Sequence, residues 1–279
     1  MSGTARDAPA LWRALAERLR AAERVLVAFS GGVDSALLAA VAAEVLGPAA
    51  VAVTAVSASL PSAERAAARA FTAQRGIGHV EVCTDELDRA EYRRNDGDRC
   101  YHCKSALLDA LAPLAALSGA RIALGTNLDD LGDHRPGQRA AADRGAIAPL
   151  VEAGLGKAEV RLLSGAMELP QASKPASACL SSRVAYGDPV TAELLGRIEH
   201  AEAGLHRLGF PVCRVRAHAA GTVARVELPA AEFPAATALR AEIDQVLRAA
   251  GFQFGALDLG GFRSGRMNVL LGIPAIASR

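Results

Sequence analysis

The sequence predicts an α/β fold, in which a parallel sheet joined by helices is followed by a smaller α+β domain. Short apolar runs alternate with helical patterns through the first part of the chain, which is typical of a parallel sheet. The first of these runs, residues 25–29, ends in a Ser-Gly-Gly turn that leads directly into a helical pattern. From about residue 190 the composition changes to alternating strands between helices. With 279 residues the chain has room for two ordinary domains, which we expect at residues 1–185 and 186–279.

The first domain is expected to alternate strands and helices along the chain. Leu11, Leu15 and Leu19 recur with the spacing of one helix face, so an amphipathic helix comes first and packs without a chemical role. Ser62 is the expected N-cap of a later helix, and Cys83 is expected to be a small core residue of the third strand. The predicted strands cover residues 25–29, 50–56, 79–83 and 121–124, a short apolar run at 146–150 closes the sheet, and further helices cover residues 33–46, 62–74, 104–117 and 155–169.

The second domain begins with a predicted helix over residues 191–208 and an alternating strand over residues 212–216. In that strand Arg214 and Arg216 lie on one face, while Cys213 alternates away from them and is expected to be packed. Arginine on a strand face beside a cleft suits the recognition of a phosphate or a carboxylate. The remaining predicted elements are a partner strand at 222–228, a helix at 239–250 and short strands at 256–259 and 269–271.

The composition excludes several classes of protein. With 31 basic and 30 acidic residues the formal net charge is +1, which argues against a broad nucleic-acid surface. Apolar content of 51% with only 4% aromatic residues predicts a core of Ala, Leu and Val. Residues 1–10 are polar and lack the apolar core of a signal peptide, and no run of about 18 apolar residues is present to span a membrane. We therefore expect a cytoplasmic enzyme with no membrane partner and no nucleic-acid partner.

The loop SGGVDS at residues 30–35 lies between the first strand and the helix that follows it. Its glycines allow a tight turn and a close approach of the backbone to a ligand. The helix N-terminus presents N–H groups and the positive end of its dipole to an anion. Ser30 and Ser35 add hydroxyl donors, and Asp34 adds a carboxylate that can orient Mg2+ or a leaving group. The loop is therefore predicted to bind an anion, a Ser/Gly turn of an ordinary α/β protein being the alternative.

The loop lacks the lysine of a Walker A motif and the pattern G-x-G-x-x-G of dinucleotide-binding proteins. It resembles the SGGxDS pyrophosphate-binding loop of the ATP pyrophosphatase (PP-loop) superfamily, whose members cleave ATP between the α and β phosphates and adenylate a carbonyl or carboxyl oxygen. The parallel-sheet domain is then expected to be a PP-loop domain. In that superfamily the end of the second strand contacts adenine, so Ser57 is a candidate there, a polar strand end being the alternative. The ATP-binding residues that the resemblance implies are Ser30, Gly31, Gly32, Asp34 and Ser35.

A second polar loop, GTNLDD at residues 125–130, follows the fourth predicted strand. In α/β sheets, ligands bind at the carboxyl ends of the strands. The loop resembles the second signature of one PP-loop branch, which adds Gly125, Asn127 and Asp130 to the nucleotide site. Asp130 is then a candidate ligand of Mg2+. An ordinary Asx turn is the alternative.

Five cysteines occur in a chain without a secretion signal, which indicates metal or thiol chemistry rather than a disulfide framework. Cys100 and Cys103 enter a predicted helix three residues apart and can point at one metal or redox centre. The helix N-terminus and the basic neighbours Arg99 and Lys104 favour the thiolate. The pair alone is compatible with zinc, an iron–sulfur cluster, a redox disulfide or coincidence, although a tetrahedral zinc site would need a second pair, which the sequence lacks.

Cys179 lies in the sequence SKPASACLSSR at residues 173–183, a proline-containing loop of small residues. Lys174 and Arg183 flank it, and positive charges near a thiol favour the thiolate, which is the better nucleophile and metal ligand. A core cysteine would instead be expected in an apolar strand or helix. We therefore predict a functional role for Cys179.

Taken together, these motifs, the RVR strand at residues 214–216 and the sequence FRSGRMN at residues 262–268 resemble the LarE family, and the resemblance covers nearly the whole chain. LarE-like proteins are sulfur transferases of nickel-pincer nucleotide cofactor assembly. They use ATP and Mg2+ to adenylate the carboxylates of pyridinium-3,5-biscarboxylic acid mononucleotide, which then become thiocarboxylates. The resemblance implies that the smaller domain binds this substrate or supports a homo-oligomer.

The resemblance implies two possible routes for the sulfur. In single-cysteine members, the cysteine at the position of Cys179 is sacrificed and becomes dehydroalanine. In three-cysteine members, a [4Fe-4S] cluster at those positions carries an extra sulfide. This chain has Cys100, Cys103 and Cys179, so the resemblance implies a cluster held by all three, with sulfide or another sulfur donor as a partner. Three thiolates leave one iron of such a cluster without a protein ligand, where sulfide could bind.

The resemblance also implies roles for individual side chains. Cys179 and Asp34 are the expected catalytic residues. Arg214 and Arg216 are expected to face the substrate phosphate. Glu202 lies where the family has an acidic residue in its cleft, although no tight motif sets the register there. The remaining expected substrate residues are Arg183, Arg263 and Ser264.

Three other functions stay open at the level of the sequence. A PP-loop tRNA thiolase would use the same ATP loop and the same three cysteines, but it would need an RNA-binding extension or basic patch that a chain of net charge +1 lacks. An amidating ligase would share the ATP loop but has no use for three cysteines. A non-catalytic nucleotide-binding module would keep the loop intact without turning over ATP.

Overall fold

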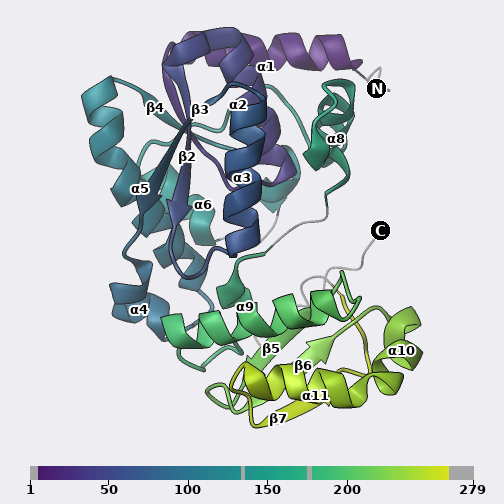
Figure 1. Cartoon of the computed structure of the whole chain (residues 1–279). Coiled ribbons are helices and arrows are strands. Elements are labelled where there is room, and N and C mark those ends of the chain that lie inside the picture. The colour runs from purple at the N-terminus through teal and green to yellow at the C-terminus, as the bar shows by residue number, and fades with distance from the viewer. Residues whose placement is uncertain (1–5, 133–135, 175–177, 264–279) are drawn as a thin grey trace. The chain divides into compact units, whose positions relative to one another are not determined.

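A computed structural model describes residues 6–132, 136–174 and 178–263 of the chain (Figure 1). The strand expected at 269–271 lies outside these residues. Within the described residues, no helix is both long enough and apolar enough to cross a membrane. The chain forms two compact units, of which the first takes in residues 1–85 and 100–177 and the second residues 86–99 and 178–279. The second stretch of the second unit begins at residue 178, close to the domain boundary expected at residue 185. The exact boundary stays a prediction.

The first unit is built on a parallel sheet, which confirms the predicted α/β class. Successive residues of a strand point to opposite faces, and Val25 and Val27 accordingly pack in a different cluster from Leu26. The strands lie in the spatial order β3 (Gly78–Cys83), β2 (Ala50–Val56), β1 (Val25–Ala28) and β4 (Arg121–Leu124).

The apolar run at residues 146–150 does not form the closing strand that we expected. Ile147 makes a single parallel bridge with Ala123 of β4. Pro149 then starts the short helix α7 (Pro149–Glu152). Because proline has no N–H group to donate to a neighbouring strand, pairing stops after that bridge.

Helices cover both faces of the parallel sheet (Figure 1). On one face, α2 (Val33–Leu46) is buried along most of its length and packs against α1 (Ala8–Ala22) and α8 (Lys157–Ala166). On the other face, α5 (Arg99–Ser118) contributes leucine side chains to the packing. The other helices of this unit are α3 (Ser62–Gln74) and α6 (Pro136–Asp143), with 3-10 turns η1 (Gly47–Ala49), η3 (Leu128–Gly132) and η4 (Pro170–Ser173).

Two local predictions about this unit are wrong. Ser62 does not cap α3, because it is already the first helical residue and Pro61 occupies the cap position without a side-chain hydrogen bond. Cys83 is exposed rather than part of the core. The reason is that β3 is an edge strand of the sheet and Cys83 is its exposed last residue.

The second unit contains a three-stranded sheet of β5 (Arg214–His218), β6 (Val223–Glu227) and β7 (Phe254–Leu257), in that order. β5 runs antiparallel and β7 parallel to β6. The hydroxyl oxygen of Thr191 accepts a hydrogen bond from the backbone N of Leu194 at 3.1 Å and so caps the next helix. This arrangement confirms the smaller α+β domain. Its helices and turns are α9 (Ala192–Arg207), α10 (Phe233–Ala238), α11 (Arg240–Ala249), η5 (Leu180–Arg183) and η6 (Ala230–Glu232).

Residues 86–99 also belong to the second unit, although they lie between β3 and α5 in the sequence. They form η2 (Glu86–Asp88) and α4 (Ala90–Arg93). Asn95 is fully buried, and its side-chain amide donates hydrogen bonds to the carbonyl oxygens of Ala185 (2.7 Å) and Asp188 (3.0 Å). Nothing in the sequence pattern indicated this packing.

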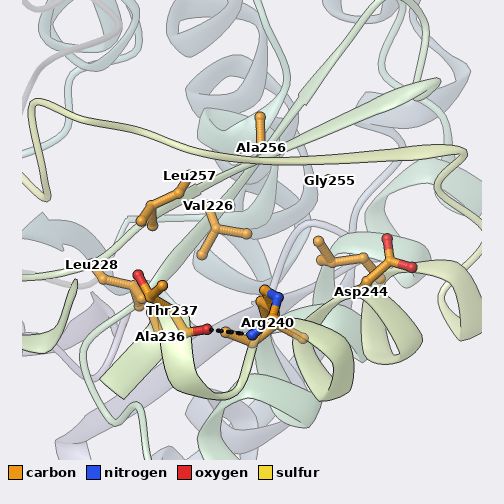
Figure 2. A pocket seen from close by; sticks show the side chains of 11 residues that line it. Val226, Leu228, Ala236, Thr237, Arg240, Asp244, Gly255, Ala256 and Leu257 are labelled. Carbon is orange, nitrogen blue, oxygen red and sulfur yellow. Dashed lines mark hydrogen bonds between the residues drawn. The ribbon is translucent and has the colours of Figure 1, made fainter. Parts of the chain in front are cut away.

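A cavity of the second unit lies between β6, β7, α10 and α11 (Figure 2). Its lining is mostly apolar, and Arg240 donates a hydrogen bond to the carbonyl oxygen of Thr237 beside it (3.5 Å). Along β6, the lining residue Val226 alternates with Arg225 and Glu227, so the cavity and these charged residues lie on opposite faces of the strand. None of the described residues that line the cavity is an expected site residue.

Candidate functional site

The phosphate loop, residues 30–35, connects β1 to α2. Gly31 has φ of +73°, a conformation that favours glycine. Gly32 is the N-cap of α2 and has no side chain that could accept a hydrogen bond from the N–H groups of the first turn. These N–H groups are the donors that an anion at a helix N-terminus uses. The hydroxyl oxygens of Ser30 and Ser35 lie 3.1 Å apart at the same helix end. The loop therefore has the backbone shape and the donors of an anion site.

Gly125 lets β4 end directly against the start of α2. A Cβ atom at this position would lie 2.9 Å from the backbone N of Ser35 and 3.1 Å from the carbonyl carbon of Asp34. Any larger residue would push these two loops apart. Gly125 therefore serves the site through packing, and the loop after β4 is held next to the phosphate loop.

Asn127 links the two loops. It is fully buried, and its Nδ2 donates a hydrogen bond to Oδ1 of Asp34 at 2.9 Å. Its Oδ1 accepts hydrogen bonds from the backbone N of Asp129 (3.0 Å) and of Asp130 (3.3 Å), which is an Asx turn. The side chain of Asp130 in turn accepts from the backbone N of Asn127 at 3.1 Å. The loop is therefore an Asx turn, and this turn orients the amide group of Asn127 that holds Asp34. An Asx turn and a nucleotide-binding role of this loop are compatible.

Asp129 contacts the start of a helix rather than the phosphate loop. Its Oδ2 accepts a hydrogen bond at 2.5 Å from the backbone N of Lys157, the first residue of α8. A Cβ atom on Gly156 would lie 2.7 Å from the same oxygen, so the glycine leaves room for the carboxylate. Asp129 therefore caps a helix.

Ser57 follows the last residue of β2 and is half-buried. Its hydroxyl oxygen lies 2.8 Å from that of Ser59, and it also accepts a hydrogen bond from the backbone N of Ser59 at 3.2 Å. This is the polar strand end that we considered as the alternative. A contact between Ser57 and adenine stays a prediction.

Lys174, which the sequence places near Cys179, has its ammonium group at the phosphate loop. The Nζ atom donates hydrogen bonds to Oε2 of Glu64 at 2.5 Å and to the carbonyl oxygen of Gly31 at 3.3 Å. Glu64 lies in the first turn of α3. A cation and a carboxylate from two further elements therefore meet at this loop.

In the second unit, Arg183 positions the backbone around Cys179. Its side chain is almost completely buried, and Nε and a terminal nitrogen donate to the two carboxylate oxygens of Glu202 at 3.1 and 3.2 Å. Another nitrogen donates to the carbonyl oxygens of Cys179 (2.9 Å) and Ala178. Glu202 also accepts from the backbone N of Val215 at 3.0 Å. The pair thus connects the Cys179 segment, α9 and β5.

Arg216 is likewise paired with a carboxylate. Two of its nitrogens donate to Oε2 of Glu227 at 3.0 and 2.9 Å, and a third donates to the carbonyl oxygen of Ser182 at 2.9 Å. Arg225 contacts the other oxygen of Glu227 at 2.9 Å and also pairs with Asp258. These groups form a buried network of charges on one face of the small sheet.

Arg214 differs from the other arginines of this sheet. Its guanidinium lies 5.3 Å from the centre of the Phe262 ring and, among the described residues, it donates a hydrogen bond to the carbonyl oxygen of Cys213 (2.7 Å) rather than to a carboxylate. Burial lowers the pKa of Arg214, and the positive charge of Arg183 lowers it further. A role of Arg214 in binding an anion stays a prediction. Arg263 is exposed, and Ser264 lies outside the described residues.

None of the five cysteines forms a disulfide bond within the described residues. Cys100 is exposed and Cys103 is half-buried, and both lie in the first turn of α5. Cys179 is half-buried and precedes η5. Cys213 is fully buried, as expected, and burial raises the pKa of its thiol to about 12, so it is the least reactive of these groups.

A family model for asparagine synthase matches residues 8–101, which include the phosphate loop. An uncharacterized protein of Synechocystis sp. is 45% identical over 253 residues, which cover 89% of this chain and 93% of that protein. A pyridinium-3,5-bisthiocarboxylic acid mononucleotide synthase of Lactiplantibacillus plantarum is 37% identical over 256 residues, which cover 91% of this chain and 92% of that protein. The chain belongs to the LarE family.

Membership of the LarE family, together with the PP-loop domain, identifies an ATP-dependent sulfur-transferring enzyme of cofactor biosynthesis. The first unit of this LarE-family protein supplies the ATP loop, and its phosphate loop has the geometry described above. ATP use is therefore established at the level of the family, while the individual ATP ligands stay predictions.

The LarE-family chain offers suitable donors for Mg2+. The carboxylates of Asp34 and Asp130 contact the same asparagine, and Mg2+ prefers oxygen ligands while keeping several waters and phosphate oxygens. Two carboxylates beside a phosphate loop therefore fit this ion. Within residues 6–132, 136–174 and 178–263, no group of three or more His, Cys, Asp or Glu side chains is arranged to hold a metal ion by itself.

The three expected cluster ligands are divided between the units. Cys100 and Cys103 belong to the first unit and Cys179 to the second. Thiols are the donor type that iron–sulfur clusters use, and a helix brings side chains three residues apart to one face. The donor type of these residues therefore suits a cluster, and their assembly around one cluster in this LarE-family protein stays a prediction.

Sequence reasoning missed several residues that organise the site. It did not identify the helix cap of Asp129 or the network of Arg225, Glu227 and Asp258. One signal was available, since Arg225 and Glu227 are two residues apart in a predicted strand and so share a face. A buried face with charges of both signs predicts ion pairs.

Proposed function

We propose that this LarE-family protein adenylates the carboxylates of pyridinium-3,5-biscarboxylic acid mononucleotide with ATP and converts them to thiocarboxylates for nickel-pincer cofactor assembly. The observation that carries the proposal is the 37% identity, over more than nine tenths of both chains, to a pyridinium-3,5-bisthiocarboxylic acid mononucleotide synthase. The intact SGGVDS loop supports the ATP part, and three cysteines outside any disulfide support the sulfur part.

The first step needs the ATP loop. A substrate carboxylate oxygen attacks the α phosphorus of ATP, the bond to the β phosphate oxygen breaks, and pyrophosphate leaves. In this proposal, backbone and hydroxyl groups of Ser30, Gly31, Gly32 and Ser35 would hold the pyrophosphate. Asp34, held by Asn127, and Asp130 would hold Mg2+, which when bound supplies positive charge to the phosphates.

The second step replaces the adenylate by sulfur. A carboxylate is a poor acyl donor until its oxygen becomes a leaving group, and adenylation supplies AMP as that group. A sulfur nucleophile then attacks the acyl carbon and AMP leaves. In the cluster route proposed below the nucleophile is sulfide, so its attack and the departure of AMP give the thiocarboxylate directly. We assign Cys179 to holding that sulfur source, with Arg183, paired with Glu202, holding the Cys179 backbone.

We propose that Cys100, Cys103 and Cys179 hold a [4Fe-4S] cluster, which would supply an exchangeable sulfide when bound. Support comes from the second unit. Arg99 donates a hydrogen bond at 2.8 Å to the carbonyl oxygen of Ser181, two residues after Cys179, and the next residue after Arg99 is Cys100. Sulfide or another small sulfur donor would then be a partner. The alternative is that Cys179 alone gives up its sulfur.

We propose that the substrate phosphate binds at Arg214. The support is its position beside the buried charge network, where the other arginines are paired with carboxylates. Arg216 then contributes by holding the carbonyl of Ser182. Arg263, which is exposed, and Ser264 are further candidates for the phosphate.

Product analysis tests the proposed function. The full-length protein, prepared without oxygen, is incubated with labelled ATP, Mg2+, the pyridinium mononucleotide and sulfide. We expect AMP, pyrophosphate and the thiocarboxylate, with AMP formation dependent on the mononucleotide. ADP as the main product would contradict PP-loop chemistry, and thiolation of tRNA in place of the mononucleotide would contradict the proposed substrate.

A further inference from the structure

Lys174 brings a positive charge to the phosphate loop from a distant part of the chain. Its Nζ donates a hydrogen bond to the carbonyl oxygen of Gly31 at 3.3 Å, across a sequence separation of 143 residues. The loop itself, residues 30–35, contains no lysine or arginine. A loop that binds the phosphates of ATP would therefore take a cation from another element.

Glu64 balances this charge. Its Oε2 lies 2.5 Å from Nζ of Lys174, and the two side chains are only 20% and 26% exposed. The carboxylate is also close to the loop, since a Cβ atom on Gly31 would lie 3.9 Å from the same oxygen. A carboxylate at this position repels an incoming phosphate, and the ammonium group between them compensates for that repulsion.

We propose that Lys174 is a ligand of the β and γ phosphates of ATP, and that Glu64 holds its ammonium group at the loop until the phosphates bind. An ammonium group has three N–H donors, so Lys174 can contact a phosphate oxygen and keep its bond to Gly31. It supplies the charge that a Walker A lysine supplies from within its own loop. The inference rests on the proposed function, because it requires ATP in the phosphate loop.

The two members of the pair have opposite expected effects on phosphate binding. Lys174→Met removes the cation. Glu64→Gln keeps the cation and removes the carboxylate that competes with the phosphate for the ammonium group. Calorimetry on the full-length protein with Mg2+ would measure the affinities for pyrophosphate, ATP and AMP. We expect Lys174→Met to weaken pyrophosphate and ATP binding about tenfold and Glu64→Gln to strengthen pyrophosphate binding about threefold. AMP lacks the β and γ phosphates, so its affinity stays unchanged in both variants.

A purely structural pair would give a different pattern. Both substitutions break the same ion pair, so a structural role would change the pyrophosphate affinity in the same direction and would change AMP binding as well. Lys174→Arg keeps the charge and is expected to recover part of the affinity. Arg65→Met is the matched control, because it breaks the neighbouring pair of α3, Arg65 with Glu81 (2.7 Å), and should leave pyrophosphate binding unchanged.

The outcomes separate this inference from the proposed function. If the wild-type protein binds neither ATP nor pyrophosphate, both are wrong. If the wild type binds both and Lys174→Met binds pyrophosphate equally well, the inference is wrong and the proposed function stands. Thermal unfolding shows whether each variant folds. Should Lys174→Met not fold, unchanged or weaker pyrophosphate binding by Glu64→Gln overturns the inference.

Discussion

Asp34 and Asp129 are carboxylates of two neighbouring loops with different partners. Asp34 is half-buried, and its Oδ1 accepts a hydrogen bond from the side chain of Asn127, which orients the carboxylate. Asp129 accepts from the backbone N of Lys157 and caps α8. One carboxylate is therefore oriented for a ligand, and the other stabilises the fold.

We expect Asp34→Ala to lower AMP formation by at least about a hundredfold while the free energy of unfolding changes by less than about 0.5 kcal/mol. The matched control, Asp129→Ala, is expected to keep turnover and to lower the free energy of unfolding by about 1 kcal/mol, because a helix cap is lost. AMP release and urea denaturation check both variants. Turnover by Asp34→Ala close to that of the wild type would contradict the assignment.

Arg214 and Arg216 differ in their pairing, so their substitutions should differ too. Arg216→Ala leaves the fully buried Glu227 with one cation fewer and is expected to lower the free energy of unfolding by about 3 kcal/mol. Arg214→Ala removes no ion pair with residues 6–132, 136–174 or 178–263 and is expected to weaken binding of the mononucleotide about tenfold. Denaturant titration and substrate binding separate the two effects. Unchanged substrate affinity in both variants would move the phosphate site toward Arg263.

The Cys213 thiol makes stability depend on pH in the alkaline range. Burial raises the pKa of this thiol to about 12, and the negative charge of Glu202 adds to the effect. In the unfolded chain a thiol ionises with a pKa of about 8.5, so the unfolded state releases a proton that the folded state keeps. The stabilisation is fully present below that unfolded value and is lost as pH rises toward the folded one.

The expected loss from Cys213 is up to about 1.4 kcal/mol for each pH unit above about pH 9. Urea denaturation of the wild type and of Cys213→Ala at several pH values measures it, because other groups contribute equally to both proteins. The wild type should lose stability more steeply with pH than the variant. Parallel pH profiles would show that the thiol does not contribute.

At the scale of the elements, the start of α5 and the turn η5 carry the proposed sulfur chemistry. Cys100 and Cys103 are one helical turn apart, and Cys179 directly precedes η5. Arg99, at the first position of α5, donates to the carbonyl of Ser181 in η5. Arg99 is buried, and Cys100 is the next residue of the chain.

Reconstitution with iron and sulfide in the absence of oxygen is expected to give about four irons for each chain, the content of a cubane cluster. The Cys→Ser variants at positions 100, 103 and 179 should each lose iron and sulfur transfer together, because each removes one ligand. Iron analysis and thiocarboxylate formation are the measurements, and Cys213→Ser is the matched control that should keep its iron.

The sacrificial alternative gives another outcome for these variants. It needs Cys179 alone, so Cys100→Ser and Cys103→Ser would keep full activity. Mass spectrometry would then show Cys179 losing its sulfur after one turnover. That result would replace the cluster in the proposed function and leave the substrate unchanged.

At the scale of the whole molecule, the expected ATP residues lie in the first unit and the arginines of the substrate site in the second. Substitutions should therefore separate by unit in their kinetic effect. Ser35→Ala is expected to raise the KM for ATP, and Arg214→Ala the KM for the mononucleotide, each by about tenfold. Steady-state AMP formation with either reactant varied is the measurement. A rise of both KM values in both variants would contradict this division.

Local patterns predicted much of the fold. α2 and β2 have the predicted bounds, because an apolar run that ends at a glycine turn is a property of adjacent residues. The exposure of Cys83 was predicted wrongly, since it depends on β3 being an edge strand. Whether a strand is central or at the edge depends on pairing with segments far away in the sequence.

The sequence by itself determined the family, the α/β class and the positions of the two loops predicted to bind ATP, because each rests on residue types at a fixed short spacing. Only the tertiary structure decided how the charged side chains are paired. It assigned Arg183 to Glu202, Arg216 to Glu227 and the ammonium group of Lys174 to the phosphate loop. The physical reason is that an ion pair depends on distances of a few ångströms between segments far apart in the chain, and no local spacing encodes such distances.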